Sequence, residues 1–273
     1  MTAVYQAEVH AFDRPSRHAR LSLAEAALLI RDRHAAAVLL DLVDPAELEG
    51  WWNDKAFPEV TQHQSFPGAG KSGLAIGPTQ RLVNEQLVPG LIDYFSYGAS
   101  CNAALRQTNF VKLCERELNA RSVRVGEWGE FPLVSKREYQ PIEGGVYSVP
   151  PHCDAIHFGR EPERWPIAEG YEEGFDQISI FLSVRDSENG ARLVMWEYRA
   201  GSRPELDELM SEYARSGRIE RLEGVPKLVI KGHPGQLNVL NTRAMHAVEQ
   251  CKTVRQTLGS FAVWHDGQWG MFH

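Results

Sequence analysis

Long hydrophobic runs are absent from this sequence of 273 residues, whose longest apolar run, Ala35 to Leu40, is short. A membrane-spanning helix needs about 20 consecutive apolar residues, so we expect no membrane partner. The N-terminal segment MTAVYQAEVHAFDRPSRHAR also lacks the basic-then-apolar order of a secretory signal peptide. These absences predict a cytoplasmic protein.

Cysteine is scarce, and basic residues are not concentrated in any one stretch. The four cysteines lie far apart with no CxxC pair, which argues against a structural zinc site and favours buried thiols. Lysine and arginine total 29 against 36 acidic residues, giving a formal charge of −7. Without a basic stripe to contact phosphates, nucleic acid is not an expected partner.

The remaining composition is that of an ordinary globular protein, with 43% hydrophobic and 24% charged residues. We predict a single domain over residues 1–273. Its first part, residues 1–120, is expected to be a helical layer with a few strands. Its second part, residues 121–273, is expected to be a strand-rich core with a helical insert near 202–216.

Helical patterns dominate the first part. Ser22 and Glu25 form a capping box before a helical pattern over 23–34, and a buried strand is expected over 36–43. Asp44 and Pro45 open a further expected helix over 46–57. A loop rich in glycine and proline follows, and helical patterns return over 79–94 and 102–118. The pair Trp51-Trp52 is interpreted as a contact between this layer and the core, with a homodimer contact as the alternative.

Short β-branched or aromatic segments dominate the second part, with glycine, proline or asparagine in most of the gaps between them. The segments are 122–128, 133–140, 145–149, 177–184, 192–198, 227–232, 236–241 and 256–264. This texture predicts a mainly β protein with helices (α+β), built as a jelly roll packed against the N-terminal helices.

His152 and Asp154 stand in the segment VPPHCDA. On a strand, residues i and i+2 point to the same face, so this imidazole and carboxylate can reach one ion. Pairs with this spacing also arise by chance, so the motif alone is weak.

A second element strengthens the interpretation. His246 follows the turn and strand of GQLNVLN, Arg255 comes nine residues later, and Thr257 shares a strand face with Arg255. Two histidines and one carboxylate form the facial triad that binds non-haem Fe(II) and leaves coordination positions open. The arginine fork can bind a carboxylate, and the hydroxyl can add a hydrogen bond.

The order HxD, distal histidine and Arg-x-Thr resembles the iron- and 2-oxoglutarate-dependent oxygenases. The resemblance covers roughly Ser122 to Trp264. It implies a double-stranded β-helix (a cupin-like jelly roll) with an N-terminal helical layer. The implied iron ligands, which are also the implied catalytic residues, are His152, Asp154 and His246.

The same resemblance implies the cofactors Fe(II), 2-oxoglutarate and O2. Arg255 would pair with the distal carboxylate of 2-oxoglutarate, with Thr257 assisting, while the 2-oxo and C1 carboxylate groups would chelate the iron. The implied reaction couples decarboxylation to succinate and CO2 with oxidation of an unactivated C–H bond. Hydroxylation is the expected outcome, with desaturation and ring closure as alternatives.

The GxLxxxNxRxxHxV pattern starting at Gly235 most resembles family members that act on small molecules. These include enzymes of free amino acids, such as the radical halogenases of free lysine and their hydroxylase relatives, as well as enzymes of natural-product intermediates. Halogenases replace the triad carboxylate with a small residue. Because this chain keeps Asp154, oxygen insertion is favoured over halogenation.

Several residues are candidates for contact with a small-molecule substrate. Arg137 and Tyr139 share one face of the strand expected before the iron-binding strand, although an exposed alternating strand would give the same pattern. An aromatic wall and a carboxylate could receive an ammonium group. The complete set of candidates is Arg137, Tyr139, His157, Trp264 and Asp266.

Two other classes remain open from the residues. A cupin-type metal enzyme would use the same triad without 2-oxoglutarate, and Arg255 would then matter little. A non-catalytic jelly-roll binding protein would take up no Fe(II).

Overall fold

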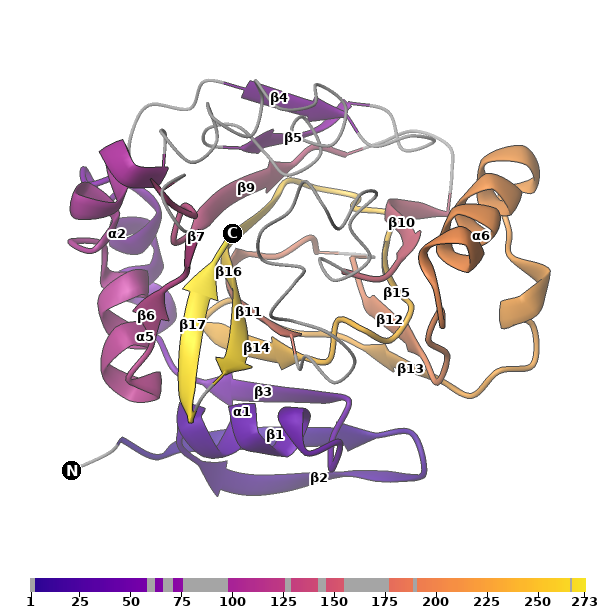
Figure 1. Ribbon diagram of the computed structural model, residues 1–273, viewed down its shortest axis with the longest axis horizontal. Coiled ribbons are helices and arrows are strands. Elements are labelled where there is room, and N and C mark those ends of the chain that lie inside the picture. The colour runs from indigo at the N-terminus through magenta and orange to yellow at the C-terminus, as the bar shows by residue number, and fades with distance from the viewer. Residues whose placement is uncertain are drawn as a thin grey trace.

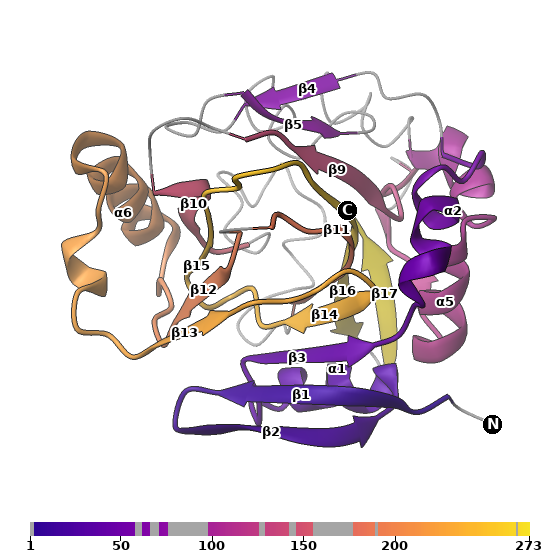
Figure 2. The same cartoon turned by 180° about the vertical axis from the view of Figure 1, so that it is seen from behind.

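The computed structural model describes most of the chain. The described residues are 3–57, 62–65, 71–75, 98–125, 129–141, 146–154, 177–188, 191–265 and 267–273. Figures 1 and 2 show the arrangement from two opposite sides.

The larger sheet has eleven strands among the described residues, and it combines the N-terminal segment with the C-terminal half. Its main path runs β2 (Arg14–Leu21), β1 (Tyr5–Ala11), β3 (Ala37–Asp41), β14 (Gln236–Leu240), β11 (Gln177–Arg185), β16 (Arg255–His265), β9 (Ser135–Tyr139), β5 (Lys71–Ala75) and β4 (Gln62–Ser65). Strand β17 (Gln268–Phe272) also pairs with β16, and β6 (Arg121–Ser122) pairs with β17.

The smaller sheet has four strands in the order β10 (Tyr147–His152), β15 (His246–Glu249), β12 (Leu193–Trp196) and β13 (Lys227–Ile230). A separate short pair joins β7 (Arg124–Val125) to β8 (Gly129–Glu130). Leu193 and Met195 of the smaller sheet pack with Leu39 and Leu240 of the larger one. Two antiparallel sheets with their apolar faces together form a jelly roll, as the sequence predicts.

Helices cover the outer face of the larger sheet (Figure 1). They are α1 (Leu23–Arg31), the 3-10 turn η1 (Pro45–Glu47), α2 (Leu48–Trp52) and α5 (Asn109–Leu118). The predicted capping box is confirmed, since Ser22 Oγ accepts from the Glu25 N–H and Glu25 Oε2 accepts from the Ser22 N–H. Ile30 of α1 and Phe110 of α5 are fully buried with sheet residues such as Ile180 in one apolar core.

Helix α6 (Arg203–Ser216) covers the outer face of the smaller sheet and is followed by the turn η5 (Glu220–Leu222). Its Leu206, Leu209 and Tyr213 pack against Val194 and Trp196 of β12. The insert predicted near 202–216 is therefore confirmed. The molecule is layered: helices, larger sheet, smaller sheet, then α6.

The N-terminal part differs in detail from the prediction. A few strands were expected there, but the sequence patterns did not locate β1 and β2, which with β3 extend the larger sheet. The helix predicted over 102–118 is interrupted, because Thr108 Oγ1 accepts from the Val111 N–H and starts α5 afresh. Residues 98–105 are also helical. The helix predicted over 79–94 lies outside the described residues.

Among the helices of the described ranges, none combines the length and the apolar content required to cross a membrane.

Candidate active site

Two histidines and one aspartate meet beside the smaller sheet. His152 ends β10, His246 begins β15, and the two are cross-strand partners in that antiparallel pair. Asp154 lies two residues past the end of β10, where its backbone N–H donates to the carbonyl of Thr242 over 2.9 Å. The structure therefore brings together the three ligand candidates, although Asp154 follows the strand instead of lying on it.

The polar atoms of these three side chains converge. Nε2 of His152 lies 3.7 Å from Oδ1 of Asp154, and Nε2 of His246 lies 3.6 Å from Oδ2. The three potential ligand atoms all lie within 4.8 Å of one another. In the described part of the chain, no other group of three histidine, cysteine or acidic side chains is arranged to hold an ion.

Both imidazoles are oriented by backbone carbonyls. Nδ1 of His152 lies 2.7 Å from the carbonyl of Pro150, and Nδ1 of His246 lies 2.9 Å from that of Ala244. A carbonyl only accepts hydrogen bonds, so each Nδ1 carries a hydrogen and Nε2 is the nitrogen of each ring that can bind a metal.

Burial and the neighbouring His152 lower the pKa of His246 to about 4, so its ring is neutral at neutral pH. Two imidazoles that each turn Nε2 inward and one carboxylate form a donor set suited to a divalent transition metal. Such a set leaves positions on the ion for other ligands. The residues present therefore fit the Fe(II) that the sequence predicts.

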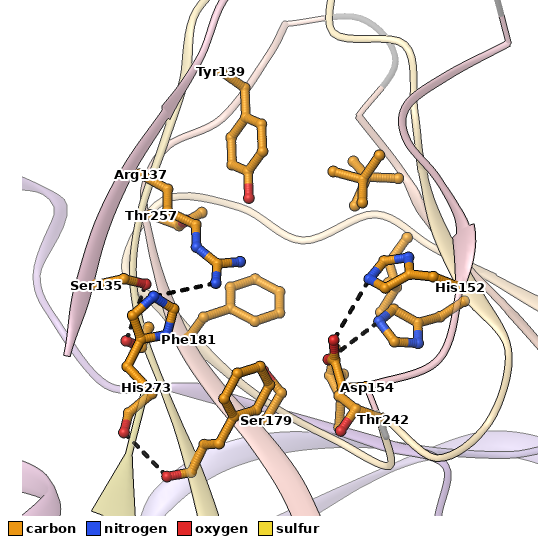
Figure 3. A pocket seen from close by; sticks show the side chains of 18 of the residues that line it. Ser135, Arg137, Tyr139, His152, Asp154, Ser179, Phe181, Thr242, Thr257 and His273 are labelled. Carbon is orange, nitrogen blue, oxygen red and sulfur yellow. Dashed lines mark hydrogen bonds and ion pairs between the residues drawn. The ribbon is translucent and has the colours of Figure 1, made fainter. Parts of the chain in front are cut away.

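A pocket between the two sheets opens beside this triad (Figure 3). The smaller sheet contributes His152, His246 and apolar side chains such as Val149, Leu193 and Val248. The larger sheet contributes residues of β9, β11, β14 and β16. The pocket thus places the triad on one wall and the strand that carries Arg255 on another.

Arg255 and Thr257 both line this pocket and are both buried. The guanidinium carbon of Arg255 lies 5.5 Å from the ring centroids of both Tyr139 and Phe181. Its Nε lies 3.7 Å from Oδ1 of Asp186, whose other oxygen lies 2.8 Å from Nζ of Lys231. Contact through Nε orients the fork and leaves its terminal nitrogens available to another anion.

Arg137 and Tyr139 line the same pocket, as their alternation along β9 suggests. Arg137 is the cross-strand partner of Thr257, and Tyr139 is that of Arg255. A terminal nitrogen of Arg137 lies 3.4 Å from Nε2 of His273 (Figure 3).

The expectation for Trp264 requires correction. Along β16, the residues that line the pocket are Arg255, Thr257, Gly259, Ser260 and Phe261. Trp264 lies further along this strand and packs at the margin of the core under the helices. Its ring meets Trp269 edge-on, with the guanidinium of Arg31 4.6 Å from its centroid. His157 and Asp266 lie outside the described residues.

Sequence reasoning missed several pocket residues. Phe181 sits in the predicted strand 177–184, where alternation could have placed it on the inner face. Asp186, the ion-pair partner of Arg255 just beyond β11, was also missed, because no motif marks it. His273 comes from β17's C-terminal side, and only the three-dimensional fold brings it to Arg137.

Comparison with known proteins shows a strong similarity to solved structures of a dioxygenase. A crystal structure described as a novel N-substituted L-amino acid dioxygenase from Burkholderia ambifaria AMMD is 30% identical to this chain, covers 100% of both chains and has a TM-score of 0.83. A second crystal structure with the same description, from the same organism and in complex with alpha-ketoglutarate (2-oxoglutarate), is also 30% identical to this chain. It covers 100% of both chains and has a TM-score of 0.81. No protein-family model matches the chain, and no curated protein sequence matches it.

Proposed function

The chain belongs to the Fe(II)- and 2-oxoglutarate-dependent oxygenases, and on that basis we propose that it hydroxylates a C–H bond of an N-substituted amino acid. As a member of this family it is a dioxygenase that uses Fe(II), 2-oxoglutarate and O2. The substrate class and the residue roles below are the proposal.

His152, Asp154 and His246 are proposed to hold the iron. The observation that carries this assignment is the convergence of two carbonyl-oriented imidazoles and one carboxylate on a common point. Bound there, the iron would supply the activation of O2 and the oxidative decarboxylation of 2-oxoglutarate. The protein's part is to hold both Nε2 atoms toward the ion and to present the organic substrate beside them.

Arg255 and Thr257 are proposed to bind the distal carboxylate of 2-oxoglutarate. Arg255 is buried in the pocket, is stacked among aromatic rings, and is fixed through Nε by Asp186. Its terminal nitrogens can therefore form a charge-assisted pair without reorganising the side chain. Thr257 lies two residues along the same strand face and supplies a hydroxyl.

An amino acid N-substituted with an acyl group fits the charges of the pocket better than a free one. Among the described lining residues, the only acid is Asp154, which is already assigned to the iron. A free amino acid carries an α-ammonium group, which would be buried there without a carboxylate partner at a substantial cost. An acylated nitrogen carries no such charge. The relative that is 30% identical is described as acting on N-substituted L-amino acids, which supports the same class.

Succinate release tests the proposal. Fe(II)-loaded enzyme is given 2-oxoglutarate, O2 and either N-acetyl-L-amino acids or the matching free amino acids, and hydroxylated products are identified by mass spectrometry. We expect hydroxylation of one or more N-acetyl compounds and little of their free counterparts. Preferential hydroxylation of free amino acids would contradict the substrate class while leaving the family assignment intact.

Binding of the cosubstrate can be followed separately. Anaerobic addition of 2-oxoglutarate to the Fe(II) protein is expected to produce a weak visible charge-transfer band at roughly 500–530 nm, as for a metal chelated by a 2-oxo acid. The band should be lost when His246 is replaced by alanine. A band that persists in this variant would contradict the assignment of the iron ligands.

A further inference from the structure

A second arginine in the pocket has no carboxylate partner. Arg137 is half-buried on β9, and its Nε is buried without a hydrogen bond. A terminal nitrogen of Arg137 lies 3.4 Å from Nε2 of His273, a neutral acceptor. Within the described residues, no acidic side chain lies within 4.0 Å of this guanidinium, whereas Arg255 on the neighbouring strand has Asp186.

A guanidinium so placed is prepared for an anion. Burying a charge without a counterion is costly, and an anionic ligand would remove much of that cost. His273 is buried beside Arg137, and Ser135 lines the same part of the pocket (Figure 3). His273 contacts one terminal nitrogen of the guanidinium and leaves the other terminal nitrogen for a ligand.

The cosubstrate does not account for both arginines. 2-Oxoglutarate has two carboxylates, and the proposed function assigns one to the iron and the other to Arg255. Arg137 therefore adds a positive charge beyond what the cosubstrate needs. The excess predicts a second anion in the pocket.

We propose that Arg137, held by His273, binds the α-carboxylate of the organic substrate and so fixes which C–H bond faces the iron. This inference rests on the proposed function, because an amino acid N-substituted with an acyl group keeps its carboxylate and loses its ammonium charge. With the carboxylate on the larger sheet, the apolar part of the substrate faces Val149, Leu193 and Val248 of the smaller sheet. Val149 and Val248 lie on the strands that carry His152 and His246, and Leu193 lies on β12, which pairs with the strand of His246.

The experiment removes the charge from each partner in turn. The enzyme variant is Arg137→Gln, and the substrate variant is the primary amide of the N-acetyl-L-amino acid with the highest turnover. In the wild type, replacing the acid with the amide should raise KM about 10- to 100-fold, since a hydrogen-bonded charge pair is lost. In Arg137→Gln, KM for the acid should rise by a similar factor and KM for the amide should change little.

Two further measurements identify what Arg137 serves. The dissociation constant of 2-oxoglutarate, from the visible band under anaerobic conditions, should stay within about twofold of wild type, and this binding also reports that the variant folds. Calorimetric titration of the acid into the Fe(II)–2-oxoglutarate protein should show the weakened substrate binding without turnover.

Arg137→Lys should recover part of the affinity. Arg20→Gln, an exposed arginine on β2, is the matched control and should behave as wild type.

Each contrary outcome has its own meaning. A large loss of 2-oxoglutarate affinity in Arg137→Gln would overturn the inference and assign Arg137 to the cosubstrate. Equal losses for acid and amide would overturn it in favour of a structural role. If the wild type hydroxylates no N-substituted amino acid, the proposed function fails first, and this inference falls with it.

Discussion

At the scale of single residues, the two proposed iron-binding histidines are fixed in the same way. Each donates its Nδ1–H to the carbonyl two residues before it, Pro150 for His152 and Ala244 for His246. Asp154 is held by its own backbone N–H, which leaves both carboxylate oxygens turned toward the histidines. The backbone thus sets the donor geometry, and a change in one donor side chain should leave the other two in place.

Asp154→Asn tests the carboxylate of the proposed iron site. The amide keeps the size of the side chain but removes its negative charge, so the ion loses its only charged protein ligand. Loss of a residue that only hydrogen-bonds to a metal ligand lowers metal affinity roughly 10-fold. We expect loss of the ligand itself to lower Fe(II) affinity by more, and turnover to fall with it. Metal content after desalting and succinate release measure both. The exposed Asp13→Asn is the control, and full metal uptake by Asp154→Asn would contradict the ligand assignment.

Arg255→Gln separates cosubstrate binding from metal binding. The dissociation constant of 2-oxoglutarate should rise about 10- to 100-fold, because a charge-assisted pair becomes a neutral hydrogen bond. Fe(II) uptake should be unchanged. Asp186 keeps Lys231 and the Ser187 N–H as partners, so no uncompensated carboxylate is left buried. Unchanged 2-oxoglutarate affinity would contradict the role of Arg255.

At the scale of helices and strands, the sequence predicts those whose pattern reflects burial. Strands β11, β14 and β16 carry apolar runs, because helices cover one of their faces and the pocket side is largely enclosed. Strand β2, with the sequence RPSRHARL, is mostly exposed at the edge of the sheet. A charged edge strand prevents unwanted strand pairing and leaves no hydrophobic signal to read. Strand β15 is only four residues long, and the sequence indicated this region through the motif around His246.

Gly235 shows how one turn joins three strands. Its N–H donates to Ser183 near the end of β11, and its carbonyl accepts from the N–H groups of Leu42 and Val43 after β3. Its φ is +90°, and a Cβ atom there would lie 2.2 Å from the carbonyl oxygen of Val43. Glycine is therefore required for both conformation and space.

Gly235→Ala should lower the free energy of unfolding by more than the roughly 1–3 kcal/mol that a left-handed non-glycine residue costs. Denaturant unfolding measures the change. Gly224→Ala is the matched control, because its φ is +79° but nothing lies within 4 Å of the added Cβ. The difference between the variants isolates the contact with Val43, and equal destabilisation would show that this contact is relieved by a backbone shift.

At the scale of the whole molecule, the candidate site depends on which strands become neighbours. The triad and the Arg255–Thr257 pair were predictable, because each motif lies within a short stretch and its spacing carries chemical meaning. The contact between Arg137 and His273 joins residues 136 positions apart in sequence. It arises because β9 and β17 pair end to end with the same edge of β16, opposite β11, an arrangement that spacing along one chain does not encode.

The burial of His273 in this arrangement predicts a pH dependence of stability. Burial and the positive charge of Arg137 lower the pKa of His273 well below 6.5. Below pH 6.5 the unfolded chain therefore binds a proton that the folded chain does not, so stability falls as the pH falls. Above pH 6.5 both states are neutral at this residue, and the effect disappears.

The metal-free protein should lose at most about 1.4 kcal/mol per pH unit through His273 as the pH falls below 6.5. His246 acts in the same direction, so the wild-type slope alone does not isolate His273. Urea unfolding of wild type and His273→Gln at pH 7 and pH 5 isolates the His273 contribution to stability, because the variant lacks only that contribution. We expect the wild type to lose about 1–2 kcal/mol more than the variant over this interval. Equal losses would mean that His273 takes up its proton in the folded protein, which requires the pocket to admit water beside Arg137.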